Sequence, residues 1–166
     1  MSNLSVKKKI LIIVLPILSI FVGFILNEDL STGGSKFDFD QTFPVVEDFT
    51  NGVFNEIYKY TRHFPLHYFL LSVPQFFFDN DYITRLFYLI FASTTPLLIY
   101  LNLNKIYPKN NHYNFIISFA IIFIPYFRAS AIWPNTHLTA LIFLLISNYF
   151  FLIYQDNKKI FFVFLN

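Results

Sequence analysis

The sequence predicts an all-α protein: a polytopic bundle of membrane helices with an outer-face loop that carries amphipathic juxtamembrane helices. Of its 166 residues, 55% are hydrophobic and only 13% are charged, whereas soluble domains contain about 25% charged residues. The mean hydropathy is +0.52, and the apolar residues gather in stretches long enough for spanning helices. Nine of the ten acidic residues lie in one loop, residues 27–81. Membrane lipid is therefore the expected solvent for much of the chain.

Charge and cysteine content exclude several classes of site. The net charge of +2 is too small to indicate a nucleic-acid partner. The chain has no cysteine, which excludes a disulfide framework, a thiolate metal site and a cysteine nucleophile.

The first apolar stretch, Ile10–Leu26, follows three lysines, Lys7-Lys8-Lys9. A basic start before an apolar run also fits a signal peptide. However, the run is long, and Asn27-Glu28-Asp29 offers no small-residue cleavage site. We therefore expect an uncleaved first spanning helix.

Later stretches give three more expected crossings, at Tyr82–Leu103, Tyr113–Phe127 and Leu138–Tyr154. A further span begins at Ile160 and is cut off at Asn166. We therefore expect residues 1–166 to form one membrane domain, the N-terminal part of a larger module.

Basic residues in short loops indicate the cytoplasmic side. The stretch Phe64–Phe78 is short and contains two prolines, Pro65 and Pro74. If it does not cross, the lysines near positions 7–9, 105–109 and 158–159 all fall on one side, and loop 27–81 falls on the other. We therefore predict that Phe64–Phe78 is interfacial or re-entrant, that the N-terminus is cytoplasmic, and that the location is a bacterial inner or plasma membrane.

Within the outer loop, apolar residues recur at helical spacing from about Thr42 to Tyr60. Thr42 followed by Pro44 is a plausible helix start. We expect this helix to lie in the headgroup plane.

Two aspartates, Asp38 and Asp40, are expected between the first span and this surface helix. Carboxylates near lipid headgroups suit a divalent cation such as Mg²⁺ or Mn²⁺, or a general base acting on an acceptor hydroxyl. They can equally be solvated loop acids. Glu28 and Asp29 are interpreted as ordinary anchors at the helix exit.

Three later segments complete a recognisable order of motifs. They are Thr61-Arg62-His63-Phe64-Pro65-Leu66-His67-Tyr68-Phe69-Leu70-Leu71, Asp81-Tyr82-Ile83-Thr84-Arg85-Leu86 and Arg128-Ala129-Ser130-Ala131-Ile132-Trp133-Pro134-Asn135-Thr136-His137. With Asp38-Phe39-Asp40 before them, this order resembles the GT-C superfamily of membrane glycosyltransferases. Its members, mannosyl- and aminoarabinose-transferases among them, take sugars from polyprenyl-phosphate donors.

The resemblance implies roles for individual residues. Asp40, or its neighbour Asp38, becomes the catalytic carboxylate, which deprotonates the acceptor or helps to hold a metal. Arg85 and Arg128 become the cations for the phosphate of the lipid-linked sugar donor, because an arginine fork suits phosphate oxygens. Either arginine can instead snorkel to the headgroups.

The remaining polar residues of the motifs are candidates for substrate binding. His63 fits the histidine that precedes the family's proline, and it can equally be a packing residue. His63 and His67 are four apart, the spacing of a two-histidine metal pair, but Pro65 lies between them. Asn135 and His137 stand where the family often has an acid, so they can supply hydrogen bonds but no second carboxylate.

Other classes of function remain open. A transporter should carry ionisable residues at mid-membrane depth, and the expected spans contain none there. A non-catalytic membrane scaffold or subunit, or an inactive fragment of a transferase, stays an alternative. Convergence of Asp40, His63 and Arg128 at one outer-face cleft would favour the enzyme.

Overall fold

The computed structural model describes residues 6–30, 32–53 and 65–157, and the regular structure in these ranges is entirely helical. The prediction of an all-α protein is therefore confirmed. The helices are α1 Val6–Ile25, α2 Gly34–Thr50, α4 Leu66–Phe78, α5 Asp81–Ala92, α6 Thr95–Ile106, η1 Pro108–Asn110, α7 Asn111–Ala120, η2 Ile121–Phe123, α8 Pro125–Ile132 and α9 Thr136–Asn157.

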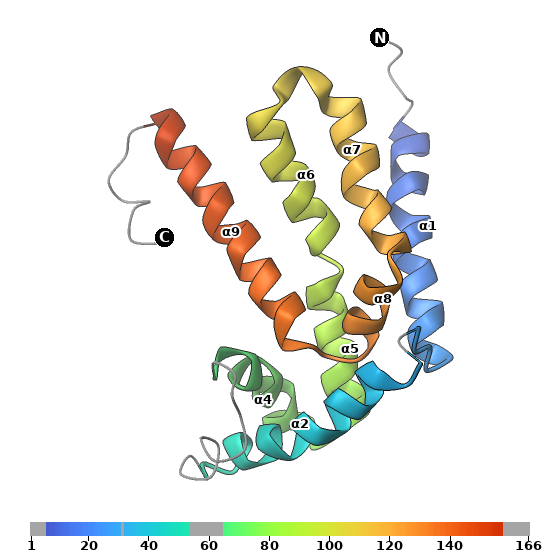
Figure 1. The fold of residues 1–166 in the computed structure, drawn as a ribbon, viewed down its shortest axis with the longest axis vertical. Coiled ribbons are helices and arrows are strands. Elements are labelled where there is room, and N and C mark those ends of the chain that lie inside the picture. The colour runs from blue at the N-terminus through green and yellow to red at the C-terminus, as the bar shows by residue number, and fades with distance from the viewer. Residues whose placement is uncertain (1–5, 31, 54–64, 158–166) are drawn as a thin grey trace.

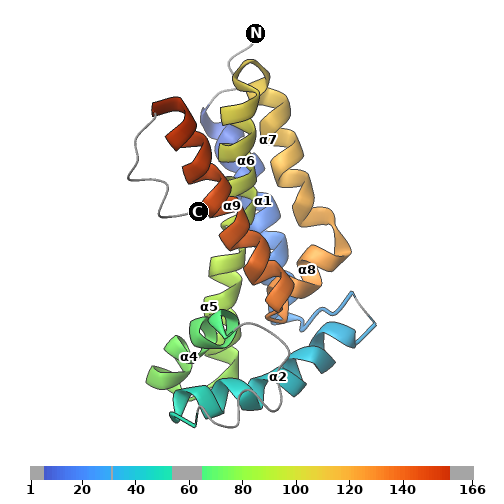
Figure 2. The same ribbon diagram turned by 60° about the vertical axis from the view of Figure 1, so that its left-hand side comes forward.

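The helices form a bundle that is closed at one end by a lateral pair. In Figure 1, α1, α6, α7 and α9 run roughly along the long axis, and α2 lies across the lower end, below α4. The start of α1, the α6–α7 connection and the C-terminal end of α9 lie at the opposite end, and Figure 2 shows the same division. The described part of the loop between residues 27 and 81 therefore carries the helices α2 and α4, both at the same end of the bundle.

Two described stretches are long and apolar enough to cross a bilayer, Asp81–Ile106 and Thr136–Gln155. They contain the expected spans Tyr82–Leu103 and Leu138–Tyr154. α1 covers most of the expected first span, and its crossing stays a prediction. α4 has only 13 residues, about 20 Å of helix, which is shorter than the roughly 30 Å hydrocarbon core. The predicted truncated span from Ile160 lies outside the described residues.

The expected span Tyr113–Phe127 is broken near its end, and it belongs to a bent helix pair, Pro108–Phe123 and Pro125–Ile132, that would be a third candidate span if the pair crosses as one. The helix formed by α7 and η2 stops at Phe123, and α8 leaves at 66° to it. Ile124 between them is extended, because the residue before a proline avoids the helical region and Pro125 then opens the next helix. Pro125–Phe127 therefore belong to a separate, bent element.

The predicted start of the lateral helix at Thr42 is also wrong. α2 begins at Gly34, after Gly33 in the left-handed conformation, and Asp29 accepts a hydrogen bond of 2.9 Å from the Lys36 backbone N–H. This carboxylate, seven positions earlier in the chain, caps the first turn of α2. The helix propensity of residues 34–41 alone would not predict a helix start at Gly34. Pro44 lies inside the helix, on its exposed side. The predicted residues 54–60 lie outside the described ranges.

Asparagine side chains join α6 to α9. Asn102 Nδ2 donates to the backbone oxygen of Leu98 at 2.8 Å and to that of Leu145 at 3.0 Å. Asn148 Nδ2 donates to Asn102 Oδ1 at 2.7 Å. Such bonds fix the register of apolar helices, since lipid offers no competing partner.

Replacing Asn102 by leucine is expected to lower the stability of the bundle by about 1 kcal/mol, because a buried interhelical network loses its central member. Thermal unfolding of the purified protein in lipid nanodiscs measures this change. Asn110→Ala is the matched control, since the Asn110 side chain makes no capping bond, and it should change stability by less than about 0.5 kcal/mol. Equal effects of the two substitutions would contradict the prediction.

Candidate functional site

The sole tryptophan lies where three parts of the chain meet: the end of α1, the start of α5 and the α8–α9 turn. Trp133 is 4% exposed, and its Nε1 donates to the backbone oxygen of Glu28 at 3.1 Å. The Phe39 ring of α2 lies 6.0 Å from the indole. We call this region, comprising Phe24, Glu28, Arg85, Arg128 and Trp133, the tryptophan corner.

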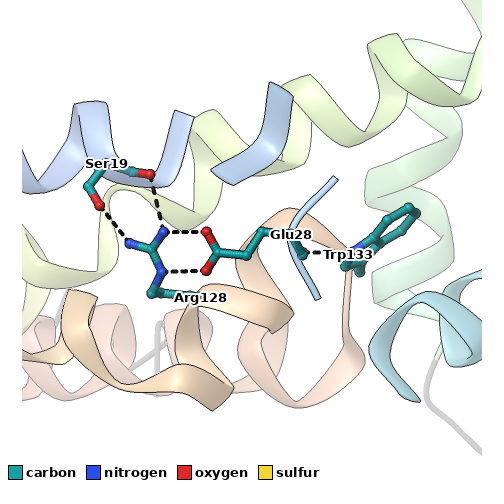
Figure 3. A network of polar contacts seen from close by, with 4 residues as sticks. All are labelled: Ser19, Glu28, Arg128 and Trp133. Carbon is teal, nitrogen blue, oxygen red and sulfur yellow. Dashed lines mark hydrogen bonds and ion pairs between the residues drawn. The ribbon is translucent and has the colours of Figure 1, made fainter. Parts of the chain in front are cut away.

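One arginine of the corner is held by a carboxylate and a serine. Arg128 Nε donates to Glu28 Oε1 at 2.8 Å, and its Nη2 donates to Oε2 at 2.7 Å. Its Nη1 donates to the Ser19 hydroxyl at 2.8 Å, so the guanidinium bridges α1, the following loop and α8 (Figure 3). Gly23 makes room for the pair, because a Cβ there would meet the Glu28 carboxylate and lie 3.0 Å from Arg128 Nη2.

The ion pair gives stability a pH dependence. The hydrogen bonds from Arg128 hold the pKa of Glu28 below its ordinary 4.5, although desolvation opposes them, and the charge of Arg128 adds to the lowering. Because the pKa is lower in the folded protein, this contribution is complete above the unfolded pKa and is lost as pH falls through the folded pKa. Unfolding midpoints measured from neutral pH down to about pH 3 should therefore fall more steeply for the wild type than for Glu28→Gln. Parallel profiles would contradict the prediction.

The second arginine is buried inside the corner. Arg85 is 4% exposed, and its carbon Cζ lies 3.5 Å from the centre of the Trp133 ring and 5.1 Å from that of Phe24. It donates to Asn27 Oδ1 at 3.2 Å and to the Ile132 backbone oxygen at 3.3 Å. These partners are neutral, so the charge of Arg85 adds positive potential to the corner.

The two aspartates lie on α2 and not in a linker, so their predicted position before the helix is wrong. Both are exposed. Residues two apart point about 200° from each other around a helix, so Asp38 and Asp40 do not fit a shared divalent site. No group of three or more potential ligand side chains gathers in the part of the chain that the structure describes. The negative charges of Asp81 and, more weakly, Asp40 act on Arg85.

The two predicted residues after Trp133 have different surroundings. Asn135 Oδ1 accepts a hydrogen bond from the His137 backbone N–H at 2.9 Å, which caps the start of α9. The His137 side chain is exposed. Asn135 therefore caps α9, and its side-chain oxygen would have to keep this hydrogen bond while it binds a substrate.

A buried polar network joins α4 to the bundle. His67 Nδ1 lies 2.7 Å from the Thr139 hydroxyl, and Tyr88 donates to the backbone oxygen of Asn135 at 2.8 Å. Thr139 and Tyr88 were not singled out from the sequence, because a lone threonine or tyrosine in an apolar stretch gives no signal. His67 is thereby directed into the protein, whereas His63 lies outside the described residues.

The structure thus brings Arg85, Arg128 and Asn135 to one end of the bundle, with Asp40 on the adjoining helix. Glu28 and Trp133 organise this end, although the sequence suggested only an anchor role for Glu28. Comparison of the chain with protein-family models, curated proteins and solved structures finds no match.

Proposed function

We propose that the chain acts as a membrane-embedded glycosyltransferase that uses a polyprenyl-phosphate sugar, with Asp40 as its general base. The observation that carries the proposal is the position of Asp40. It is exposed on a helix that lies across one end of an apolar bundle, beside a corner with two arginines. A base at the bilayer surface can meet a donor whose lipid tail stays in the membrane.

Sidedness supports this interpretation. Lys105 and Lys109 lie at the α6–α7 connection, at the end of the bundle opposite α2. Short basic connections favour the cytoplasm, so α2 and Asp40 would face the non-cytoplasmic side in a multi-pass arrangement. Lipid-linked sugars are the donors of the GT-C superfamily, which the sequence resembles. Such donors require no nucleotide in that compartment.

The reaction follows from these positions. Asp40 accepts the proton of an acceptor hydroxyl, whose oxygen forms a bond to the anomeric carbon of the sugar. The bond between that carbon and the phosphate oxygen breaks, and the phosphate leaves with the electron pair. The charge of Arg85, whose hydrogen-bond partners are neutral, lowers the cost of this departure, while Arg128 is paired with Glu28. No step is assigned to a metal, because the aspartate pair does not fit one.

The Asp40→Asn protein tests the proposal. In nanodiscs, with radiolabelled polyprenyl-phosphate mannose and related donors, transfer should fall about 10²- to 10⁴-fold, the usual contribution of a general base. Asp38→Asn decides between the two carboxylates, and its effect should be much smaller because Asp38 lies on a different face of α2 from Asp40. Gln41→Ala, also exposed on α2, is the control for folding. Unchanged transfer by Asp40→Asn would refute the role.

A scaffold subunit is the second candidate, and one observation favours it. Both arginines are engaged in internal contacts, which a purely structural domain also needs. If the wild-type chain transfers no sugar from any of these donors and its partner proteins co-purify with it, the scaffold interpretation holds in place of the enzyme.

A further inference from the structure

A polar cleft lies away from the tryptophan corner, between α2 and α4. It has a volume of about 430 Å³ and is lined by Glu47, Thr50, Asn51, Gln75, Phe76 and Asp79. α2 packs against α4, and both views show the C-terminal half of α2 passing beside α4 (Figures 1 and 2). Neither the aspartates nor the arginines considered above line this cleft.

The floor of the cleft is held in place by hydrogen bonds. Gln75 is 4% exposed, its Nε2 donates to Asp79 Oδ1 at 2.9 Å, and its Oε1 accepts from the Thr84 hydroxyl at 3.0 Å. Asp79 is therefore oriented by a buried amide, and Glu47 remains exposed beside it. The Phe76 side chain is 71% exposed, so an aromatic ring face is available next to two carboxylates.

The charge of the described lining disfavours an anionic ligand. Among the described residues that line the cleft, Glu47 and Asp79 contribute two carboxylates and none is a lysine or arginine. Both helices also end here, α2 at Thr50 and α4 at Phe78, and C-terminal carbonyl groups add partial negative charge. A phosphate or another carboxylate would be repelled.

The size of the cleft argues against a bare metal ion. A calcium ion needs 6–8 oxygens at about 2.3–2.6 Å, which requires a tight cage, whereas about 430 Å³ is within the range of pockets for small organic molecules. Hydroxyl groups suit this lining, because each can donate to a carboxylate oxygen. The C–H face of a sugar ring can also lie on an aromatic ring.

We infer that this cleft binds a neutral saccharide, whose hydroxyl groups donate to Glu47 and Asp79 and whose ring contacts Phe76. The binding itself does not require catalysis. Its assignment as the acceptor subsite rests on the proposed function.

The register of α2 connects the cleft to Asp40. Asp40, Pro44, Glu47 and Asn51 recur at spacings of four and three, and all are exposed. Residues at such spacings share one helix face. Asp40 and Glu47 are seven residues apart, which is about 10 Å along the axis, comparable with the length of a disaccharide. A saccharide held in the cleft could therefore extend along this face toward the general base.

Saturation-transfer NMR tests the inference on the full chain in nanodiscs, without a sugar-based detergent. The probes are methyl α-mannoside and methyl β-glucoside, with no donor present. Saturation should pass to the ring protons of at least one probe. Glu47→Gln and Asp79→Asn should each weaken binding about tenfold, since each removes a hydrogen bond to a charged group. Asparagine tolerates the left-handed conformation of Asp79, so the second variant keeps the backbone.

Matched controls separate the outcomes. Asp48→Asn removes the neighbouring carboxylate, which does not line the cleft, and Asp40→Asn removes the proposed base; both should bind the probes like the wild type. Absence of saturation transfer in the wild type, or binding by Glu47→Gln and Asp79→Asn as tight as that of the wild type, would overturn the inference. Binding of Mn²⁺ or Ca²⁺ that these two variants abolish, with no sugar binding, would overturn it in favour of a cation site. Sugar transfer without probe binding would refute only the saccharide site in the cleft. Probe binding without sugar transfer would refute only the proposed transferase activity.

Discussion

Arg128→Met is expected to lower the free energy of unfolding by about 2 kcal/mol, because the substitution leaves the partly buried Glu28 carboxylate without its partner. The two side chains are only 12% and 24% exposed. The substitution also removes the hydrogen bond to Ser19, which ties α8 to α1. The fluorescence of Trp133, whose indole donates to Glu28, reports unfolding at this corner directly.

A double-mutant cycle shows how much of this effect belongs to the pair. Arg128→Met with Glu28→Met should recover much of the lost stability, since replacing both partners by apolar groups removes the unpaired charge. Arg128→Lys should be intermediate, because lysine keeps the charge but not the two-pronged geometry. A double variant as unstable as Arg128→Met alone would contradict a role for the unpaired carboxylate.

Arg85→Met is expected to destabilise the protein by about 2–3 kcal/mol. The variant leaves the buried Ile132 carbonyl without its side-chain donor and removes a cation that stacks on Trp133 and Phe24. The emission of Trp133 should change as well, because the guanidinium lies 3.5 Å from the ring centre. Chemical unfolding in detergent, followed by this emission, measures both effects in one experiment.

A second cation on the same ring provides the control for Arg85. Lys36 Nζ lies 5.7 Å from the centre of the Trp133 ring and its residue is exposed, so Lys36→Met should cost less than about 0.5 kcal/mol. If Lys36→Met and Arg85→Met lower the stability equally, the loss of a cation near the Trp133 ring would explain the destabilisation. The buried hydrogen bonds of Arg85 would then contribute nothing measurable.

These predictions bear on the proposed enzyme. Arg128 is held by Glu28, and Arg85 is held between aromatic rings, so both arginines shape the corner before any substrate arrives. A donor phosphate would therefore either interact with these arginines electrostatically at a distance or displace one of their present partners. The Asp40 carboxylate is exposed, and none of the hydrogen bonds described above occupies it, so an acceptor would not have to displace a partner.

The amino-acid sequence by itself determined the class of the protein and the ranges of its long apolar helices. Composition and the length of uncharged runs are local properties, and a helix satisfies its own backbone groups in lipid. Asp81–Ile106 and Thr136–Gln155 could therefore be anticipated closely. The bend at Ile124 could also have been predicted from the sequence, because Pro125 disfavours the helical conformation at the residue before it.

Only the tertiary structure decided where α2 begins and what the arginines do. The α2 start depends on Asp29 reaching the Lys36 N–H across a turn, and the fate of Arg128 depends on Glu28, 100 positions away in the chain. The cleft likewise needs α2 and α4 side by side. Such pairings are set by packing between distant segments, and periodicity within one segment carries no information about them.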